Sequence, residues 1–201
     1  MVLTMPELPF SQACENNKDT ILAVLKRAFG DSQNVVEIGS GTGQHAVYFA
    51  KQLPHCHWQP TDQAHYLPDL NLRLQQQGPD NLLPAQVFDV FAAPPVGQFD
   101  ALFTANTCHI MPKAGVEKLF QHLNHGLASV KTLCIYGPFN DNGVFTSASN
   151  QAFDQHLKAR DPQMGLRDKQ WLEQLGNDVG FSLAGMHLMP ANNMLLVMQR
   201  R

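Results

Sequence analysis

The stretch VVEIGSGTGQH, residues 35–45, decides how this sequence folds. The run Val35 to Ile38 has the pattern of a short buried strand, three glycines follow at alternate positions, and a helical pattern begins at Gln44. Glycines let a backbone turn sharply and approach a ligand closely, so a strand, a glycine turn and a helix together are typical of a nucleotide-type site. A glycine-rich turn without a ligand is the alternative interpretation.

Extended and helical patterns alternate along most of the chain. Five strands are expected, over 35–38, 56–61, 86–88, 99–105 and 131–136. Helices are expected over 17–29, from the glycine turn to 53, from 67 to 77, from 112 to 123 and over 168–179. This alternation predicts a parallel sheet covered on both faces. Two last runs, 182–189 and 193–199, are joined by so short a link that they predict an antiparallel hairpin.

The pattern changes after Tyr136. Residues 137–166 are rich in glycine, proline, asparagine and aspartate, and contain one expected helix over 150–160. Connections this long tend to carry function. We therefore expect a single domain over 1–201, with an N-terminal helical segment over 1–30 and an insertion over 137–166 that covers the active-site edge of the sheet.

Composition narrows the class of protein. The chain has 14 basic and 17 acidic residues, a balance that argues against a general binder of nucleic-acid phosphates. The longest clean apolar run, Met194 to Met198, predicts no membrane span, and the first residues lack the basic region of a secretory signal. Four dispersed cysteines predict free thiols in a reducing cytoplasm and no metal site: Cys14, Cys56, Cys108 and Cys134.

The glycine spacing departs from the dinucleotide fingerprint G-x-G-x-x-G. The third glycine, Gly43, comes one residue early, and Gln44 stands where the fingerprint has glycine. Glu37, two residues before Gly39, would bring negative charge toward a pyrophosphate, but it suits a ligand that carries an ammonium and a sulfonium group. These features disfavour a nicotinamide-dependent oxidoreductase.

The pattern from Glu37 to Gly43 resembles E/D-x-G-x-G-x-G, the first motif of class I S-adenosylmethionine-dependent methyltransferases. The resemblance implies an α/β, Rossmann-like, doubly wound sheet of seven mostly parallel strands with helices on both faces. The implied strand order is 3-2-1-4-5-7-6, and the last strand is antiparallel. The implied cofactor is S-adenosylmethionine, with S-adenosylhomocysteine as product and no metal.

Two acids agree with this resemblance. Asp62 ends the second strand 23 residues after Gly39, where these enzymes bind the ribose hydroxyls, and a carboxylate suits a vicinal diol. Asp89 ends the third strand, where they recognise the adenine amino group beside an apolar residue such as Phe88 or Val90. Each acid alone could equally be a helix cap or turn residue. The implied cofactor contacts are Glu37, Gly39, Ser40, Gly41, Gly43, His45, Asp62, Asp89, Val90, Asn106 and Asn17.

A closer resemblance covers residues 11–201 and is to the methyltransferase-like domain of unknown function 938. The matching stretches are 15–18, 41–45, 58–60, Asn106 with His109, 136–139, 149–150 with 153–154, 165–168 and 189–193. Two positions depart from that family, since Asn16 replaces a usual arginine and Met164 a usual tryptophan.

Acceptor residues are expected beyond the carboxyl ends of the strands, where open parallel sheets bind ligands. His109 is the first candidate for a general base because an ordinary histidine pKa lies near 6.5, and Tyr136 is the second. The candidate acceptor contacts are Phe139, Asn140, Asn150, Asn192 and Asn193. A structural role is the alternative for each, since asparagine favours turns and His109 precedes a helix.

The predicted function is in-line methyl transfer to a small-molecule acceptor, with no nucleic-acid or membrane partner. The N-P-P-[YFW] motif of enzymes that methylate base amino groups is absent, because Asn106 is followed by Thr107 and Cys108. A non-catalytic, S-adenosylmethionine-binding interaction module is the alternative. An aminopropyl transferase is separated from these only by resemblance, and the oligomeric state stays open.

Overall fold

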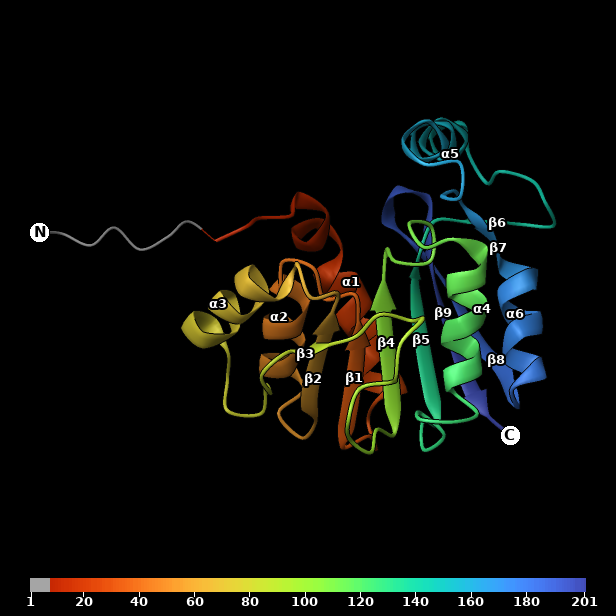
Figure 1. Ribbon diagram of the computed structural model, residues 1–201. Coiled ribbons are helices and arrows are strands. Elements are labelled where there is room, and N and C mark those ends of the chain that lie inside the picture. Colours follow the sequence, from red (N-terminus) through yellow and green to blue (C-terminus); the bar gives the residue numbers. More distant parts are fainter. Residues whose placement is uncertain (1–7) are drawn as a thin grey trace, which may run out of the picture.

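A computed structural model describes residues 8–201. The first seven residues of the expected N-terminal segment 1–30 lie outside this range. The centre of the protein is a seven-stranded sheet in the order β3-β2-β1-β4-β5-β9-β8 (Figure 1). The strands are β1 (Asn34–Ile38), β2 (His57–Asp62), β3 (Gln86–Val87), β4 (Ala101–Ala105), β5 (Thr132–Gly137), β8 (Phe181–Met189) and β9 (Asn193–Arg200).

The pairing confirms the predicted sheet. β1 to β5 run parallel, whereas β9 is antiparallel to both of its neighbours, β5 and β8. β8 and β9 therefore form the expected hairpin, and β8 points in the same direction as β1 to β5. Its turn, η1 (Pro190–Asn192), consequently reaches the edge at which those strands end.

Helices cover both faces of the sheet, as the alternation predicts (Figure 1). One face packs against α1 (Gln12–Ala28), α2 (Gln44–Gln52) and α3 (Leu67–Gln77), and the other against α4 (Lys113–His122) and α6 (Lys169–Asp178). Alternate strand residues feed the two cores: Phe103 packs with the first group of helices and Leu102 with the second. This two-residue period is what a strand buried on both faces requires.

Two helices begin earlier than the sequence predicts. α1 begins at Gln12 and not at Asn17, because the Ser11 hydroxyl accepts a hydrogen bond from the Cys14 N–H (3.4 Å) and caps the helix. Asn17, where the sequence predicts the helix to begin, is therefore a buried residue inside α1. α5 (Ala148–Arg160) is capped in the same way by Ser147.

The segment after β5 contains a small second sheet that the sequence did not predict. β6 (Phe139–Asn140) pairs in parallel with β7 (Arg167–Asp168), and α5 lies between them in the chain. Strands of two residues are too short to show a period. α5 lies beyond the carboxyl ends of β4 and β5 (Figure 1). Asp168, where the sequence predicts the last long helix to begin, is the N-cap of α6.

Two further features of residues 8–201 bear on function. No helix in this range combines the length and the apolar character that crossing a membrane requires. The same residues place no group of three or more His, Cys, Asp or Glu side chains where it could hold a metal ion. The four cysteines are free thiols.

Candidate functional site

Two cavities open at the carboxyl edge of the sheet. The smaller cavity has a volume of about 240 Å³ and the larger cavity about 580 Å³. Residues 106–111, the loop after β4, form a wall of both: Thr107, Ile110 and Met111 line the smaller cavity, and Asn106 and His109 line the larger one. The two cavities are therefore neighbours across a single loop.

The glycine turn fits tightly against this shared loop. Gly39 has a φ of +74°, and a Cβ atom there would lie 2.3 Å from Cγ2 of Thr107. Gly43, also left-handed, would place a Cβ 2.8 Å from Cδ1 of Leu70. Side chains are thus excluded at both positions, which lets the backbone after β1 lie directly beneath the smaller cavity.

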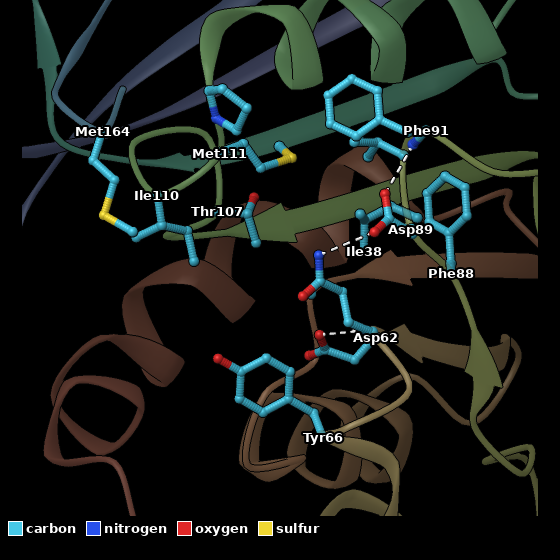
Figure 2. Close-up of a pocket in the computed structure, with 14 residues that line it drawn as sticks. Ile38, Asp62, Tyr66, Phe88, Asp89, Phe91, Thr107, Ile110, Met111 and Met164 are labelled. Carbon is cyan, nitrogen blue, oxygen red and sulfur yellow. Dashed lines mark hydrogen bonds between the residues drawn. The ribbon is translucent and has the colours of Figure 1, made fainter. Parts of the chain in front are cut away.

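Asp62 presents its carboxylate to the smaller cavity (Figure 2). Oδ2 accepts from the Gly41 N–H (2.6 Å), and Oδ1 accepts from the Gln63 N–H (2.8 Å). The side chain is fixed by these bonds, and each oxygen keeps lone pairs for a ligand. Burial raises the pKa of Asp62, while the two backbone N–H groups oppose that shift.

Asp89 provides a second carboxylate in an otherwise apolar part of the smaller cavity (Figure 2). It accepts from the Phe91 N–H (2.9 Å) and from Nε2 of Gln63 (3.3 Å). Phe88 and Val90 beside it are buried. A flat, apolar group with a polar edge would find both a matching wall and an acceptor here.

Several implied cofactor contacts lie behind the cavities and line neither. Glu37 accepts from Nε1 of Trp58 (2.9 Å), and complete burial raises its pKa to about 7. Ser40 accepts from the Thr61 N–H (3.2 Å), and Gly41 and Gly43 shape the turn. These residues hold the glycine turn in place.

His45 also lies behind the cavity wall. Its Nε2 is 2.7 Å from Oδ1 of Asn17, and its ring stacks on Phe49 with centroids 5.1 Å apart. Burial lowers the pKa of His45 to about 4. At neutral pH the uncharged ring therefore donates to Asn17 and orients that side chain, which lines the larger cavity.

The larger cavity collects predicted residues from distant parts of the chain. They come from α1, the loop after β4, the end of β5, α5 and the hairpin turn: Asn17, Asn106, His109, Tyr136, Asn150 and Asn193. Asn106 has a φ of +58°, so the chain turns sharply there, directly after β4.

The two candidate catalytic residues have pKa values unlike those of free side chains. His109 is 6% exposed, and burial, assisted by the charge of Arg167, lowers its pKa to about 4. The ordinary pKa assumed from the sequence is thus replaced by a lower one. Burial raises the pKa of Tyr136. At neutral pH His109 is consequently an uncharged proton acceptor, and Tyr136 keeps its proton and can donate it in a hydrogen bond.

Arg167 holds the shared loop, a role that sequence reasoning missed. Its guanidinium donates to the carbonyl oxygens of Cys108 (3.0 Å), Met111 and Gln163 (2.9 Å). The N–H of Gly165 also donates to the carbonyl oxygen of His109 (2.9 Å). Arg167 is 4% exposed and belongs to β7, a strand that the sequence did not predict.

Three predicted acceptor contacts do not line either cavity. Phe139 is 1% exposed and packs in the core. Asn140 lies in β6, and its buried Oδ1 has no hydrogen-bond partner within residues 8–201. Asn192 donates to Oγ of Ser149 (3.1 Å) and thereby ties the hairpin turn to α5.

Sequence reasoning also missed part of the wall of the smaller cavity, formed by Tyr66, Phe91, Ile110, Met111 and Met164 (Figure 2). Tyr66, Phe91 and Ile110 are 44–60% exposed despite their apolar character. The signal that could have found these three is their position, because each is an apolar residue just outside an expected strand or helix, at the carboxyl edge of the sheet.

Comparison with known proteins identifies the family. The sequence profile described as "Protein of unknown function (DUF938)" matches residues 8–200. The chain belongs to the DUF938 family. The match extends over both cavities and over the glycine turn, and it confirms the resemblance found in the sequence.

The chain is similar in fold to several solved methyltransferase structures. Human N-acetylserotonin methyltransferase, solved in complex with S-adenosylmethionine, shares 14% identity at a TM-score of 0.77, over 94% of this DUF938 chain and 53% of its own. The mitomycin 7-O-methyltransferase MmcR shares 16% sequence identity at a TM-score of 0.74. The alignment covers 90% of this chain and 54% of MmcR. An O-methyltransferase family protein from Burkholderia thailandensis shares 16% sequence identity at a TM-score of 0.75. The alignment covers 91% of this chain and 56% of that protein. The DUF938 chain thus has the class I methyltransferase fold and spans about half the length of these structures.

Proposed function

We propose that this DUF938 protein is an S-adenosylmethionine-dependent methyltransferase that acts on a small-molecule acceptor, as a single domain over 1–201 in the cytoplasm. The shared loop 106–111 carries the proposal. It places a cavity with nucleoside-binding chemistry next to a larger cavity lined by candidate proton-accepting and hydrogen-bonding groups. Bound S-adenosylmethionine would supply an electrophilic methyl group.

The residues of the smaller cavity fit the nucleoside half of that cofactor. The fixed carboxylate of Asp62 suits the two ribose hydroxyls, and Asp89 suits an exocyclic amino group. Phe88 and Val90 offer the apolar surface that a base requires. Asn106, at the boundary of the larger cavity, would contact the amino-acid end through its backbone.

The larger cavity fits the acceptor. His109 would take a proton from an acceptor group that carries one, Tyr136 would orient that group by donating a hydrogen bond, and Asn150 and Asn193 would contact the rest of the molecule. Orientation in such a site can contribute roughly 7–11 kcal/mol to catalysis. The neighbours' methyltransferase names support this reading, but the carboxylate and the shared wall are features of this chain.

The test is thermal unfolding with S-adenosylmethionine, S-adenosylhomocysteine and NAD. At about 100 times the dissociation constant, a ligand stabilises by roughly 2.7 kcal/mol, which is about 5–10 °C for a chain of this length. Asp62→Asn should lose the shift given by the two sulfur ligands. Asp100→Asn is the matched control, because Asp100 also accepts from two backbone N–H groups but before β4, at the opposite edge of the sheet. A shift with NAD alone would contradict the proposal.

A second arm measures turnover as S-adenosylhomocysteine released with a panel of small hydroxyl, thiol and amine acceptors. Release with one of them, greatly reduced in His109→Ala, would support catalysis and the role of His109. Cofactor binding without release across the panel would favour the non-catalytic binding module.

A further inference from the structure

We infer that the acceptor is an uncharged molecule that combines a flat apolar ring with hydrogen-bond donors such as hydroxyl groups. This inference rests on the proposed function and specifies the ligand of the larger cavity. Among residues 8–201, the side chains that line this cavity are amides, hydroxyls, apolar groups, aromatic rings and an imidazole. None of them is an aspartate, glutamate, lysine or arginine.

Charged side chains that adjoin the residues of this cavity in the chain or in space are already paired within the protein. The Arg167 guanidinium is bound to three backbone carbonyl groups. Asp154, next to Phe153 of the cavity wall, accepts from Nζ of Lys158 (2.7 Å) and from the Leu166 N–H (2.8 Å). Glu15, next to Asn16 on α1, accepts from Lys18 and from Nε2 of Gln44 (2.8 Å). A charged acceptor would therefore lose hydration without gaining a partner of opposite charge.

The two titratable groups in the wall are uncharged as well. The lowered pKa of His109 keeps its ring neutral at pH 7, and the raised pKa of Tyr136 keeps its hydroxyl protonated. The cavity is thus neutral throughout the physiological range, although the smaller cavity beside it contains two carboxylates.

The polar side chains that α5 and the hairpin turn bring to the cavity keep free acceptor atoms. The Asn150 amide nitrogen donates both of its hydrogen bonds within the protein, to Oγ1 of Thr146 (2.9 Å) and to the Asn192 carbonyl oxygen (2.9 Å). The Asn193 amide nitrogen donates to the carbonyl oxygens of Pro190 (3.0 Å) and Ala191 (3.2 Å). No donor within residues 8–201 bonds to the Oδ1 atom of either asparagine or to the His109 ring. These free acceptors suit a ligand that donates hydrogen bonds, and a hydroxyl group on that ligand can also accept from the Tyr136 hydroxyl.

An aromatic pair supplies the apolar surface. The Phe153 ring meets His109 edge to face, with centroids 5.2 Å apart and an interplanar angle of 75°. Phe153 remains 37% exposed, so part of its ring is available to a ligand, and Pro138 and Pro190 add apolar wall. Aromatic rings pack well against such a surface.

The test compares four probes with one ring system, in the presence of saturating S-adenosylhomocysteine, by ligand-observed NMR titration. The probes are 2-naphthol, 2-methoxynaphthalene, 2-naphthoate and 2-(aminomethyl)naphthalene as its ammonium form. We expect 2-naphthol to bind about tenfold or more tightly than either charged probe, and more tightly than the methoxy compound, which cannot donate. Phe153→Ala should weaken 2-naphthol binding. A charged probe that binds as tightly as 2-naphthol, or no binding of 2-naphthol, would overturn the inference.

A pair of charge-adding variants locates the binding. Ser149 lines the larger cavity in the first turn of α5, and Ser147 caps the same helix without lining the cavity. Aspartate suits both positions of a helix. Ser149→Asp should raise the affinity for the ammonium probe about three- to fivefold, whereas Ser147→Asp should not. Equal effects would overturn the location. If S-adenosylhomocysteine gave no thermal shift with the wild-type protein, the proposed function would fail. Failure of the inference about the acceptor is therefore distinguishable from failure of the proposed function.

Discussion

The smaller and larger cavities share one sheet edge and one loop but are built in different ways. Except for Met164, every residue that lines the smaller cavity comes from 38–112, the consecutive β-α units around the glycine turn. The larger cavity draws on five separated segments, from 11–17 to 190–193. The first contains two carboxylates, and the described lining of the second contains no charged side chain. The proposed cofactor site is thus formed by consecutive units of the chain, whereas the proposed acceptor site is assembled by the fold from distant segments.

The largest expected effect comes from replacing Arg167, whose guanidinium holds the shared loop 106–111. Arg167→Met should cost roughly 3–5 kcal/mol of unfolding free energy, because it leaves three carbonyl groups without their buried donor. It should also weaken S-adenosylhomocysteine binding, since the loop lines both cavities. Denaturant unfolding and calorimetric titration measure the two effects.

Arg200→Met is the matched control for that change. Arg200 also donates to three carbonyl oxygens, of Leu123, Val130 and Val179, at the other end of the sheet. We expect a stability loss without a loss of ligand affinity. If Arg167→Met binds S-adenosylhomocysteine as wild type does, the loop is not the common wall.

The next effect is on pH dependence. The pKa of His109 is about 4 in the folded protein, below its ordinary value of 6.5, so the unfolded chain binds the proton more readily. The stability that this neutral ring contributes is complete above pH 6.5 and is lost as the pH falls from 6.5 toward 4, by about 3 kcal/mol. His109→Gln should remove that part of the acid-side loss, as measured by denaturant unfolding from pH 7 to 4. The exposed His125→Gln serves as control, and parallel curves for wild type and His109→Gln would refute the assignment.

Alanine substitutions at two left-handed glycines of the turn, Gly39 and Gly41, test how closely the turn packs against the shared loop. Gly39→Ala should destabilise the protein by about 2 kcal/mol more than Gly41→Ala, because only the first places a Cβ against Thr107. It should also abolish S-adenosylhomocysteine binding. Adding Thr107→Ser, which deletes the obstructing methyl group and keeps the hydroxyl, should restore part of both. A double variant no better than Gly39→Ala would place the strain elsewhere.

The smallest effect concerns the larger cavity alone. Ser147→Ala removes the cap of α5 and should cost about 1 kcal/mol, while Ser147→Asp should retain the cap. Hydrogen exchange should rise in α5 of the alanine variant and leave the glycine turn unchanged. Faster exchange in both places would show that the two cavities are one mechanical unit.

Much of the fold followed from the sequence because its signals are local. The alternation of strands and helices and the short link in the final hairpin predicted a parallel sheet with a terminal antiparallel hairpin, and the resemblance to class I methyltransferases implied the strand order that the structure has. The positions of Asp62 and Asp89 at strand ends placed both in the smaller cavity.

What escaped prediction depends on contacts between distant residues. The role of Arg167 needs β7 to pack against the loop after β4, 59 residues away in the chain. The start of α1 at Gln12 is the exception, since the Ser11 cap is a local contact. Phe139 lies directly after β5, yet it points into the core because it pairs within β6. The pKa of His109 could not follow from its type, since burial sets it.

The single loop between the two cavities has a thermodynamic consequence. A ligand that displaces residues 106–111 changes the shape of both binding sites at once. Linkage then requires that the factor by which the cofactor alters acceptor affinity equals the factor by which the acceptor alters cofactor affinity. If the two cavities bind the proposed cofactor and acceptor, the strength of that cooperativity would depend on how firmly Arg167 holds these six residues.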